Sequence, residues 1–388
     1  MLDISPNAAT AFALDADQIA MRDMAKSFAD DNFAPNALTW DETRHFPVAE
    51  MRKAAALGMG GVFVAEEFGG SELSRLTGTL IFEALATGCP TVSAYMSIHN
   101  MTAWLIDAFG NDDQRKRFLP RLCTMELLAS YCLTEPGAGS DAAALTTRAE
   151  RDGDHYVLNG QKQFISGAGA GDVYLVMART GGEGAGGISA FIVPGDTPGL
   201  SIGANERKMG WNAQPTRAVT FENVRVPLAN RLGEEGQGFR IAMAGLDGGR
   251  LNIAACSLGG AQCALDKTLA YMKERKAFGK RLDEFQALQF RLADMATALE
   301  ASRALLWQAA AAFDRNDANA TALIAMAKRF VTDSCFDVAN QALQLHGGYG
   351  YLAEFGVEKI VRDLRVHQIL EGTNEIMRLI VARSLVGR

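Results

Sequence analysis

The hydrophobic pattern changes twice along the chain, and this change constrains the fold more than any other feature. Up to about residue 120, apolar residues recur at spacings of three and four, as in residues 15–33 (DADQIAMRDMAKSFADDNF), which indicates amphipathic helices. From about 121 to 232, Gly, Thr and Val are more frequent. Turns such as Asp152-Gly153 and Asn159-Gly160 separate short strand candidates at 155–160, 172–178, 188–194 and 217–226.

The helical period returns after residue 233, over the long stretches 285–313 and 320–348. Short strands without intervening helices favour antiparallel pairing, and long amphipathic helices favour a bundle. The sequence therefore predicts an α+β multidomain protein: an N-terminal α-helical domain (1–120), a middle antiparallel β-barrel or sandwich domain (121–232) and a C-terminal four-helix bundle (233–388).

Composition narrows the possible partners and locations. With 388 residues, of which 48% are hydrophobic, the chain can bury a large core, and its net charge of −7 argues against nucleic acid or anionic membranes as partners. Residues 84–106 contain no Asp, Glu, Lys or Arg but include Pro90, so we expect a buried helical region with a break there rather than membrane insertion. No basic segment precedes an apolar run at the start, which predicts a cytoplasmic protein.

The six cysteines show no CxxC pair and no histidine spacing typical of zinc, so we expect reduced thiols and no metal site. The segment GAGAG (167–171) does not fit GxGxxG and lacks the strand and helix of a Rossmann motif, so a loop is expected there.

One carboxylate stands out in the segment HQILEGTNEIM (367–377). Glu371 is placed at the end of an apolar helix and is followed by Gly372, which weakens a helix. A solvated Glu needs no such neighbours, whereas these neighbours suit a base in a dry pocket. A solvated helix-end residue remains the alternative, with Thr373 as the N-cap of the next helix.

Other segments have both a structural and a functional interpretation. YCLTEPGAGSD (131–141) is either an ordinary Pro-Gly turn or a loop whose amides and Ser140 hydroxyl bind a polar ring or phosphate. YMKERKAFG (271–279) is expected to end a helix, with cations in the last turn and Gly279 beyond it, and Arg275 could instead bind phosphate. In LDGGR, Asp247 and Arg250 suit an ion pair on one helical face.

Taken together and in order, these segments resemble the acyl-CoA dehydrogenase family of flavoenzymes. The likeness covers nearly the whole chain, through EEFGG, YCLTEPGAGSD, FISGAG, KMGWNAQPTRAVTFENVRVP, EGQGF, RKAFG, QLHGGYGYL and ILEGT. It implies FAD bound without a Rossmann fold, a homotetramer, electron transfer flavoprotein as electron acceptor, and a short acyl-CoA substrate. GWNAQPTRAV and RVHQILEGTNEIM are most similar to members acting on a short branched acyl group.

The resemblance also implies residue roles. It assigns the flavin contacts of the same subunit to Tyr131, Cys132, Leu133, Thr134, Ser140, Phe164, Ile165, Ser166, Thr373, Asn374 and Glu375. It assigns the contacts to a neighbouring subunit's FAD to Arg275, Phe285, Gln286, Gln344, Leu345, His346, Gly347 and Gly348. It assigns the substrate contacts to Ser140, Asp247, Gly248, Gly249, Arg250, Leu370, Gly372 and Arg383.

Under this resemblance, Glu371 is the catalytic base that removes the proton beside the thioester carbonyl. Isovaleryl-type members carry their base near 247–250, where this chain has Gly248-Gly249, so isovaleryl-CoA is not the expected substrate. Leu370 replaces a Tyr of many straight-chain members and could leave room for an α-methyl group, although the branch could be accommodated elsewhere. An oxygen-using oxidase relative and a silent acyl-CoA-binding protein are the alternative functions, and the silent protein would lack the base.

Overall fold

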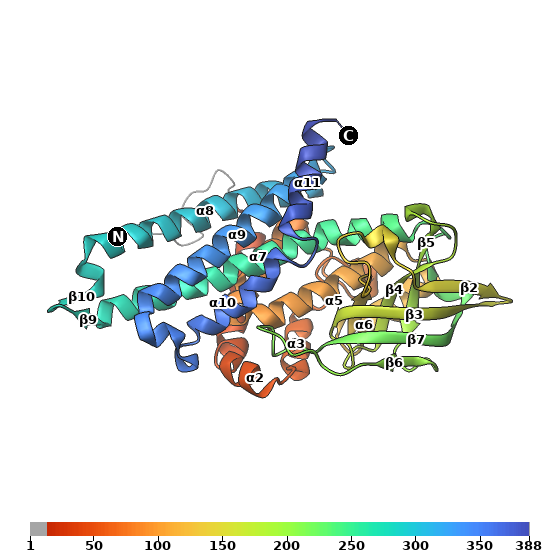
Figure 1. The fold of residues 1–388 in the computed structure, drawn as a ribbon, viewed down its shortest axis with the longest axis horizontal. Helices are drawn as coiled ribbons and strands as arrows, with labels where there is room; N and C mark the ends of the chain where they lie inside the picture. Colours follow the sequence, from red (N-terminus) through yellow and green to blue (C-terminus); the bar gives the residue numbers. More distant parts are fainter. Residues whose placement is uncertain (1–13, 388) are drawn as a thin grey trace.

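The computed structural model describes residues 14–387, and its order of elements confirms the predicted succession of helices, sheet and helices (Figure 1). The N-terminal region consists of α1 (Ala16–Phe28), α2 (Ala37–Thr43), α3 (Val48–Ala54), α4 (Arg75–Gly88), α5 (Pro90–Phe109) and α6 (Asp112–Cys123). Asp15 and Gln18 form a capping box at the start of α1. The expected break at Pro90 is confirmed, because α4 ends at Gly88 and α5 begins at Pro90, where a missing N–H is tolerated.

The middle region forms one eight-stranded sheet. Seven of its strands follow the order β6-β7-β3-β2-β4-β5-β8, and the eighth strand, β1, pairs with β4. The strands are β1 (Ala129–Cys132), β2 (Arg148–Asp152), β3 (His155–Ser166), β4 (Val173–Arg179), β5 (Ile188–Pro194), β6 (Leu200–Ile202), β7 (Thr216–Pro227) and β8 (Arg231–Leu232). Most pairs are antiparallel as expected, but β1 and β2 each run parallel to β4.

One predicted turn in the sheet is wrong. Asp152-Gly153 does connect β2 to β3, with Gly153 at φ +61°. Asn159-Gly160, however, lies inside β3, where the register to β7 shifts between Leu158 and Gly160. The glycine serves a bulge and a close approach to Thr147, whose backbone Cα would lie 2.7 Å from a Cβ added at Gly160.

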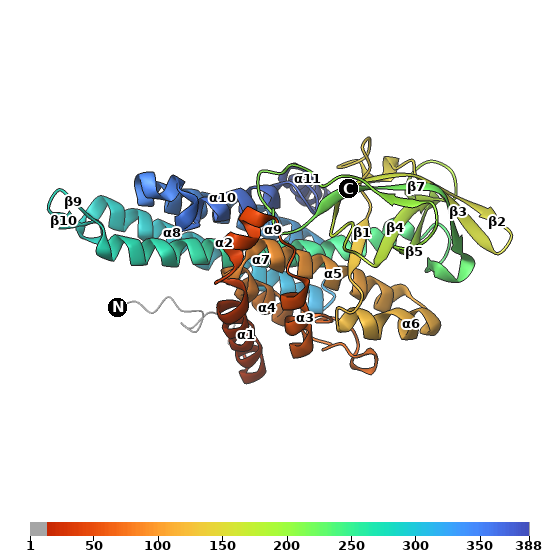
Figure 2. The same ribbon diagram turned by 90° about the horizontal axis from the view of Figure 1, so that it is seen from below.

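The C-terminal region is built from α7 (Gly238–Glu274), α8 (Gln286–Asp314) and α9 (Ala320–His346), with α10 (Val357–Arg365) and α11 (Asn374–Leu385) packed against α9. The prediction for 271–279 is wrong in detail: α7 ends at Glu274, and β9 (Lys276–Ala277) and β10 (Lys280–Arg281) form a small hairpin. Only Lys273 of the expected cations lies in the last turn. The sheet and this hairpin lie at opposite ends of the molecule in both views (Figures 1 and 2).

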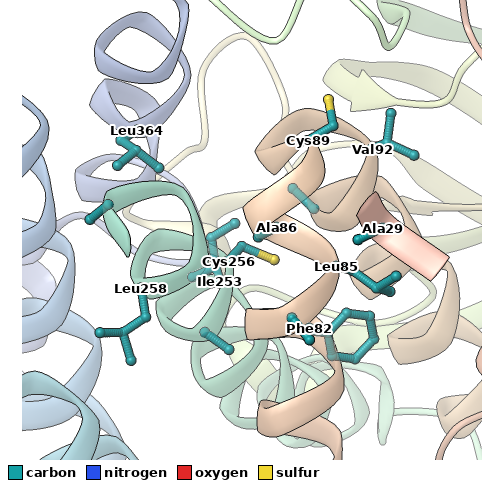
Figure 3. Close-up of a cluster of buried hydrophobic side chains, with 14 of the residues drawn as sticks. Ala29, Phe82, Leu85, Ala86, Cys89, Val92, Ile253, Cys256, Leu258 and Leu364 are labelled. Atoms are coloured by element: carbon teal, nitrogen blue, oxygen red, sulfur yellow. The ribbon is translucent and has the colours of Figure 1, made fainter. Parts of the chain in front are cut away.

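The largest core joins the N-terminal helices to the bundle, as Figure 3 shows for Phe82, Leu85 and Ala86 of α4 beside Ile253 and Cys256 of α7. The predicted boundary at 120/121 falls inside α6, and the domain limits stay predictions. Within residues 14–387, no helix combines the length and the apolar character needed to cross a membrane.

Candidate active site

Glu371 lies in a tight turn rather than at a helix end, which corrects the expectation from the sequence. A short 3₁₀ turn (Val366–Gln368) follows α10, and α11 starts only at Asn374. Glu371 has φ +57° and Gly372 has φ +84°, both in the left-handed region. A non-glycine residue in this conformation costs free energy and persists only where surrounding contacts hold it.

Two cations hold this turn through its backbone oxygens. Arg250 Nε donates to the Glu371 carbonyl at 3.1 Å, and Lys328 Nζ donates to the Gly372 carbonyl at 2.8 Å and to Asn374 Oδ1 at 2.9 Å. Lys328 is buried, and burial lowers its pKa to about 8 although Glu371 opposes that shift. Lys328 was not among the residues predicted from the sequence. The feature that could have identified it is a lysine on the buried face of an amphipathic helix.

The Glu371 carboxylate itself is left free. Its Oε2 atom is buried and has no hydrogen-bond partner within the described residues. Burial raises the pKa of Glu371 to about 7, and the nearby Arg250 and Lys328 limit this rise. A half-buried carboxylate with an unpaired oxygen and a near-neutral pKa is suited to accept a proton from a bound molecule.

The carboxylate packs directly against α7 at Gly249. A Cβ added at Gly249 would lie 2.7 Å from Glu371 Oε2, so the Gly249 position and the Glu371 carboxylate share one space. The neighbouring Gly248 approaches Arg75 Nη1, at 2.7 Å from an added Cβ. The expected ion pair between Asp247 and Arg250 is confirmed at 2.7 Å.

The structure brings the two predicted flavin-lining segments together. Gln163 N donates to the Thr134 carbonyl at 2.8 Å, and Ser130 Oγ donates to the Ser166 carbonyl at 2.9 Å, so the ends of β1 and β3 lie side by side. Because side chains alternate between the two faces of a strand, the predicted flavin contacts on β1 and β3 do not all lie on the same face. Cys132 and Ile165 are buried in the core of the sheet and could reach a ligand only through their backbone, whereas Phe164 is 63% exposed.

Tyr131, on β1, is close enough to Glu371 for the charge of Glu371 to affect its pKa. Burial raises its pKa well above the ordinary value, and the negative charge of Glu371 adds to this shift. Leu133 is buried, while Thr134 is half-buried at the end of the strand. The β1 end and the Glu371 turn are therefore electrostatic neighbours.

The loop after β1 is anchored by a buried ion pair. Glu135 lies 2.8 Å from Lys162 and accepts hydrogen bonds from Thr146 and Thr147. Burial alone would raise the pKa of Glu135, but Lys162 and these hydrogen bonds lower it to about 2. Beyond this anchor Ser140 is exposed, and no atom lies within 4 Å of a Cβ added at Gly137 or Gly139, so ligand can approach the loop.

The residues after Glu371 mainly form the cap and the first turn of α11. Thr373 Oγ1 accepts a hydrogen bond from Ile376 N, which confirms the predicted N-cap. The Asn374 amide is occupied by Lys328 and Asp333, while Glu375 is exposed. Arg383 is exposed in the last turn of α11, about 14 Å along the helix from Asn374, and the structure does not bring it to Glu371.

Most of the residues predicted to contact a neighbouring subunit's FAD line a cavity at the other end of the bundle. This cavity of ≈ 580 Å³ is lined by Tyr271, Arg275, Leu282, Leu288, Arg291, Gln344, Leu345, His346, Gly347, Gly348, Tyr349 and Leu352. Phe285 and Gln286 do not line this cavity, although Phe285 is the N-cap residue of α8, which begins beside it. From Gly249 to Tyr271 the distance along α7 is roughly 33 Å.

The residues at the β1–β3 end fit a flavin. Exposed Phe164 offers a flat apolar surface, Thr134, Ser140 and Ser166 offer hydroxyls, and the loop beyond Glu135 leaves backbone groups accessible. The unpaired Glu371 oxygen and the buried Gln214 Oε1, which also has no partner among residues 14–387, are available to accept hydrogen bonds from a ligand.

Comparison with known proteins places this architecture in one class. Sequence models of the N-terminal, middle and C-terminal domains of acyl-CoA dehydrogenases match residues 15–126, 130–224 and 236–386. The chain belongs to the acyl-CoA dehydrogenase family, as the sequence resemblance indicated.

Two relatives are particularly similar. The mitochondrial isobutyryl-CoA dehydrogenase of Bos taurus is 57% identical over 96% of this chain and 90% of that protein. The mitochondrial isobutyryl-CoA dehydrogenase of Dictyostelium discoideum is 55% identical over 99% of this chain and 92% of that protein.

Solved structures share the complete fold. Butyryl-CoA dehydrogenase from Megasphaera elsdenii superposes with a TM-score of 0.94 at 37% identity, covering 97% of this chain and 100% of that chain. The FAD complex of PigA superposes with a TM-score of 0.93 at 31% identity, covering 97% of this chain and 99% of that chain.

Proposed function

We propose that this protein is an FAD-dependent dehydrogenase that oxidises isobutyryl-CoA, a short α-branched acyl-CoA, to methacrylyl-CoA in valine breakdown. The reaction removes a proton from the carbon beside the thioester carbonyl and a hydride from the next carbon. The observation that carries the proposal is the free, near-neutral Glu371 carboxylate against Gly249.

The chain's own residues supply the proton chemistry and the positioning. FAD, when bound, supplies the hydride acceptor. Glu371 accepts the α-proton, and its pKa of about 7 makes it a stronger base than an ordinary carboxylate while leaving it ionised at slightly alkaline pH. The backbone amide of Glu371 is a donor for the thioester oxygen as negative charge grows there. Arg250 and Lys328 keep the turn in its strained conformation.

The choice of an α-branched substrate rests on three observations. Two isobutyryl-CoA dehydrogenases share more than half of the aligned residues with this chain. The space that a base on Gly249 would occupy is taken by the Glu371 carboxylate, which disfavours the isovaleryl-type arrangement. Leu370 precedes the base and is half-buried, so an apolar side chain smaller than Tyr borders the acyl α-carbon.

The cofactor and assembly belong to the same proposal. The residues at the ends of β1 and β3 and the Glu371 turn would hold the isoalloxazine ring of FAD. The cavity near Arg275 would hold part of the FAD of a neighbouring subunit, because it lies roughly 33 Å along α7 from Gly249. A homotetramer with electron transfer flavoprotein as electron acceptor follows from the family resemblance.

The decisive experiment compares flavin reduction by the parent protein and Glu371→Gln. Both should purify with FAD, but anaerobic reduction by isobutyryl-CoA should be at least 10²-fold slower in the variant, because the proton acceptor is lost. Glu67→Gln, an exposed carboxylate in the turn before α4, is the matched control and should behave like the parent. Reduction of Glu371→Gln at the parent rate would remove Glu371 from the mechanism.

A substrate panel and exposure to air then test the finer assignment. We expect the highest kcat/KM for isobutyryl-CoA among isobutyryl-, butyryl-, 2-methylbutyryl- and isovaleryl-CoA, and slow reoxidation of the reduced flavin by air. Fast reoxidation would indicate an oxidase instead, and failure of all four substrates to bleach the flavin would indicate a silent acyl-CoA-binding protein.

A further inference from the structure

Gln214 lies in the segment between β6 and β7, outside every set of residues to which the sequence resemblance assigned substrate or cofactor contacts. Its side chain is only 1% exposed. Lys208 Nζ donates to the Gln214 carbonyl at 2.6 Å, and Gln214 N donates to the Trp211 carbonyl at 3.3 Å. These bonds fix the backbone on both sides of the residue, so the direction of its side chain is set by the fold.

The Gln214 amide points toward the end of β3. Its Nε2 donates to Ser166 Oγ at 3.5 Å, and Gly167 N donates to the neighbouring Pro215 carbonyl at 2.8 Å. Gln214 Oε1, in contrast, is buried without a hydrogen-bond partner in the described part of the chain. Buried amide oxygens are nearly always paired in native proteins, so this acceptor calls for a donor from outside the described residues, such as a bound ligand.

We propose that Gln214 is a further cofactor-binding residue, whose Oε1 accepts a hydrogen bond from the imide N–H of the isoalloxazine ring of FAD. This inference rests on the proposed FAD cofactor. The imide is the N–H donor of the oxidised ring, and Ser166, which Gln214 contacts, lies among the residues that fit the ring. Because Gln214 Nε2 donates to Ser166 Oγ, the Ser166 O–H remains free to donate to the ligand.

The test compares FAD with N3-methyl-FAD, in which a methyl group replaces the imide hydrogen. Apoprotein prepared from the holoenzyme is titrated with each flavin, and binding is followed by flavin fluorescence. The parent should bind N3-methyl-FAD about 10-fold more weakly than FAD, which corresponds to about 1.4 kcal/mol. Gln214→Ala removes the acceptor and leaves space for the methyl, so it should bind both flavins within about 2-fold of each other.

Two further variants complete the design. Gln161→Ala, an exposed glutamine on β3, is the matched control and should discriminate between the flavins as the parent does. Gln214→Val also removes the acceptor and leaves space for the methyl while filling more of the site than Ala, and it replaces Gln214→Ala if the latter is unfolded by circular dichroism. Undiminished discrimination in the Gln214 variant would overturn this inference alone, whereas a parent protein that does not bind FAD would overturn the proposed function as well.

Discussion

At the scale of a residue, the proposed role of Glu371 as a base conflicts with its contribution to stability. Its pKa in the folded protein is about 7, above the ordinary value of 4.5, because the carboxyl is buried. The unfolded chain therefore ionises more readily, and the folded state loses stability as the pH rises from 4.5 through 7. Above pH 7 the cost is on the order of 3 kcal/mol.

We therefore predict that Glu371→Gln stabilises the FAD-loaded protein at pH 8 but hardly at pH 4.5, where the carboxyl is protonated in the folded state and half protonated in the unfolded chain. Thermal unfolding of parent and variant across this pH range measures the effect, and the difference in Tm should grow with pH. A difference of the same size at both pH values would show that ionisation of Glu371 is not its cause.

At the scale of elements, a buried polar network joins the segment between β6 and β7 to the chain just before Glu371. Trp211 Nε1 donates to His367 Nε2 at 3.2 Å, and Trp211 N donates to Asp363 Oδ1 at 2.7 Å. His367 Nδ1 also lies 2.7 Å from Ser257 Oγ on α7. Burial and the nearby Lys328 lower the pKa of His367 to about 3, so its ring stays neutral and Nε2 can accept.

Trp211→Phe should destabilise the protein by about 1–3 kcal/mol, because it leaves His367 Nε2 buried without a donor. His367→Leu should cost less in the Trp211→Phe background than in the parent, because the two side chains share one interaction. Urea unfolding of the parent, both single variants and the double variant provides the cycle. Additive losses would show that the two residues act independently.

At the scale of the whole molecule, the proposed sharing of FAD between subunits would link cofactor retention to assembly at the cavity near β9 and β10. Arg275 lies over the Tyr349 ring at 5.2 Å and is exposed, which makes its guanidinium available to a phosphate. Arg275→Ala should lose FAD several-fold more readily than the parent on gel filtration. Lys273→Ala, which removes an exposed cation from outside the cavity lining, should not.

Absorbance and light scattering on the same column measure the FAD content and the mass of the assembly. A fully FAD-loaded monomer, or equal FAD retention in Arg275→Ala and the parent, would contradict a cofactor shared between subunits.

Local patterns predicted elements better than they predicted functional geometry. The period of 320–348 identified α9, and Pro90 marked a helix boundary, because both signals act between near neighbours in the chain. Asn159-Gly160 was misassigned as a turn, because its glycine allows a close approach to Thr147, which lies just before β2. Lys328 was overlooked, because its partner is the Gly372 carbonyl, which belongs to a distant segment.

The sequence by itself determined the order of helical and β regions and the N-cap at Thr373, and it singled out Glu371 as the candidate base. It could do so because side-chain periodicity and capping depend on residues a few positions apart, and because the ordered motifs are specific to one family. Only the tertiary structure decided the left-handed turn of Glu371, its unpaired oxygen and its near-neutral pKa. Those properties arise from desolvation and from Gly249, Arg250 and Lys328, which folding brings to Glu371 from α7 and α9.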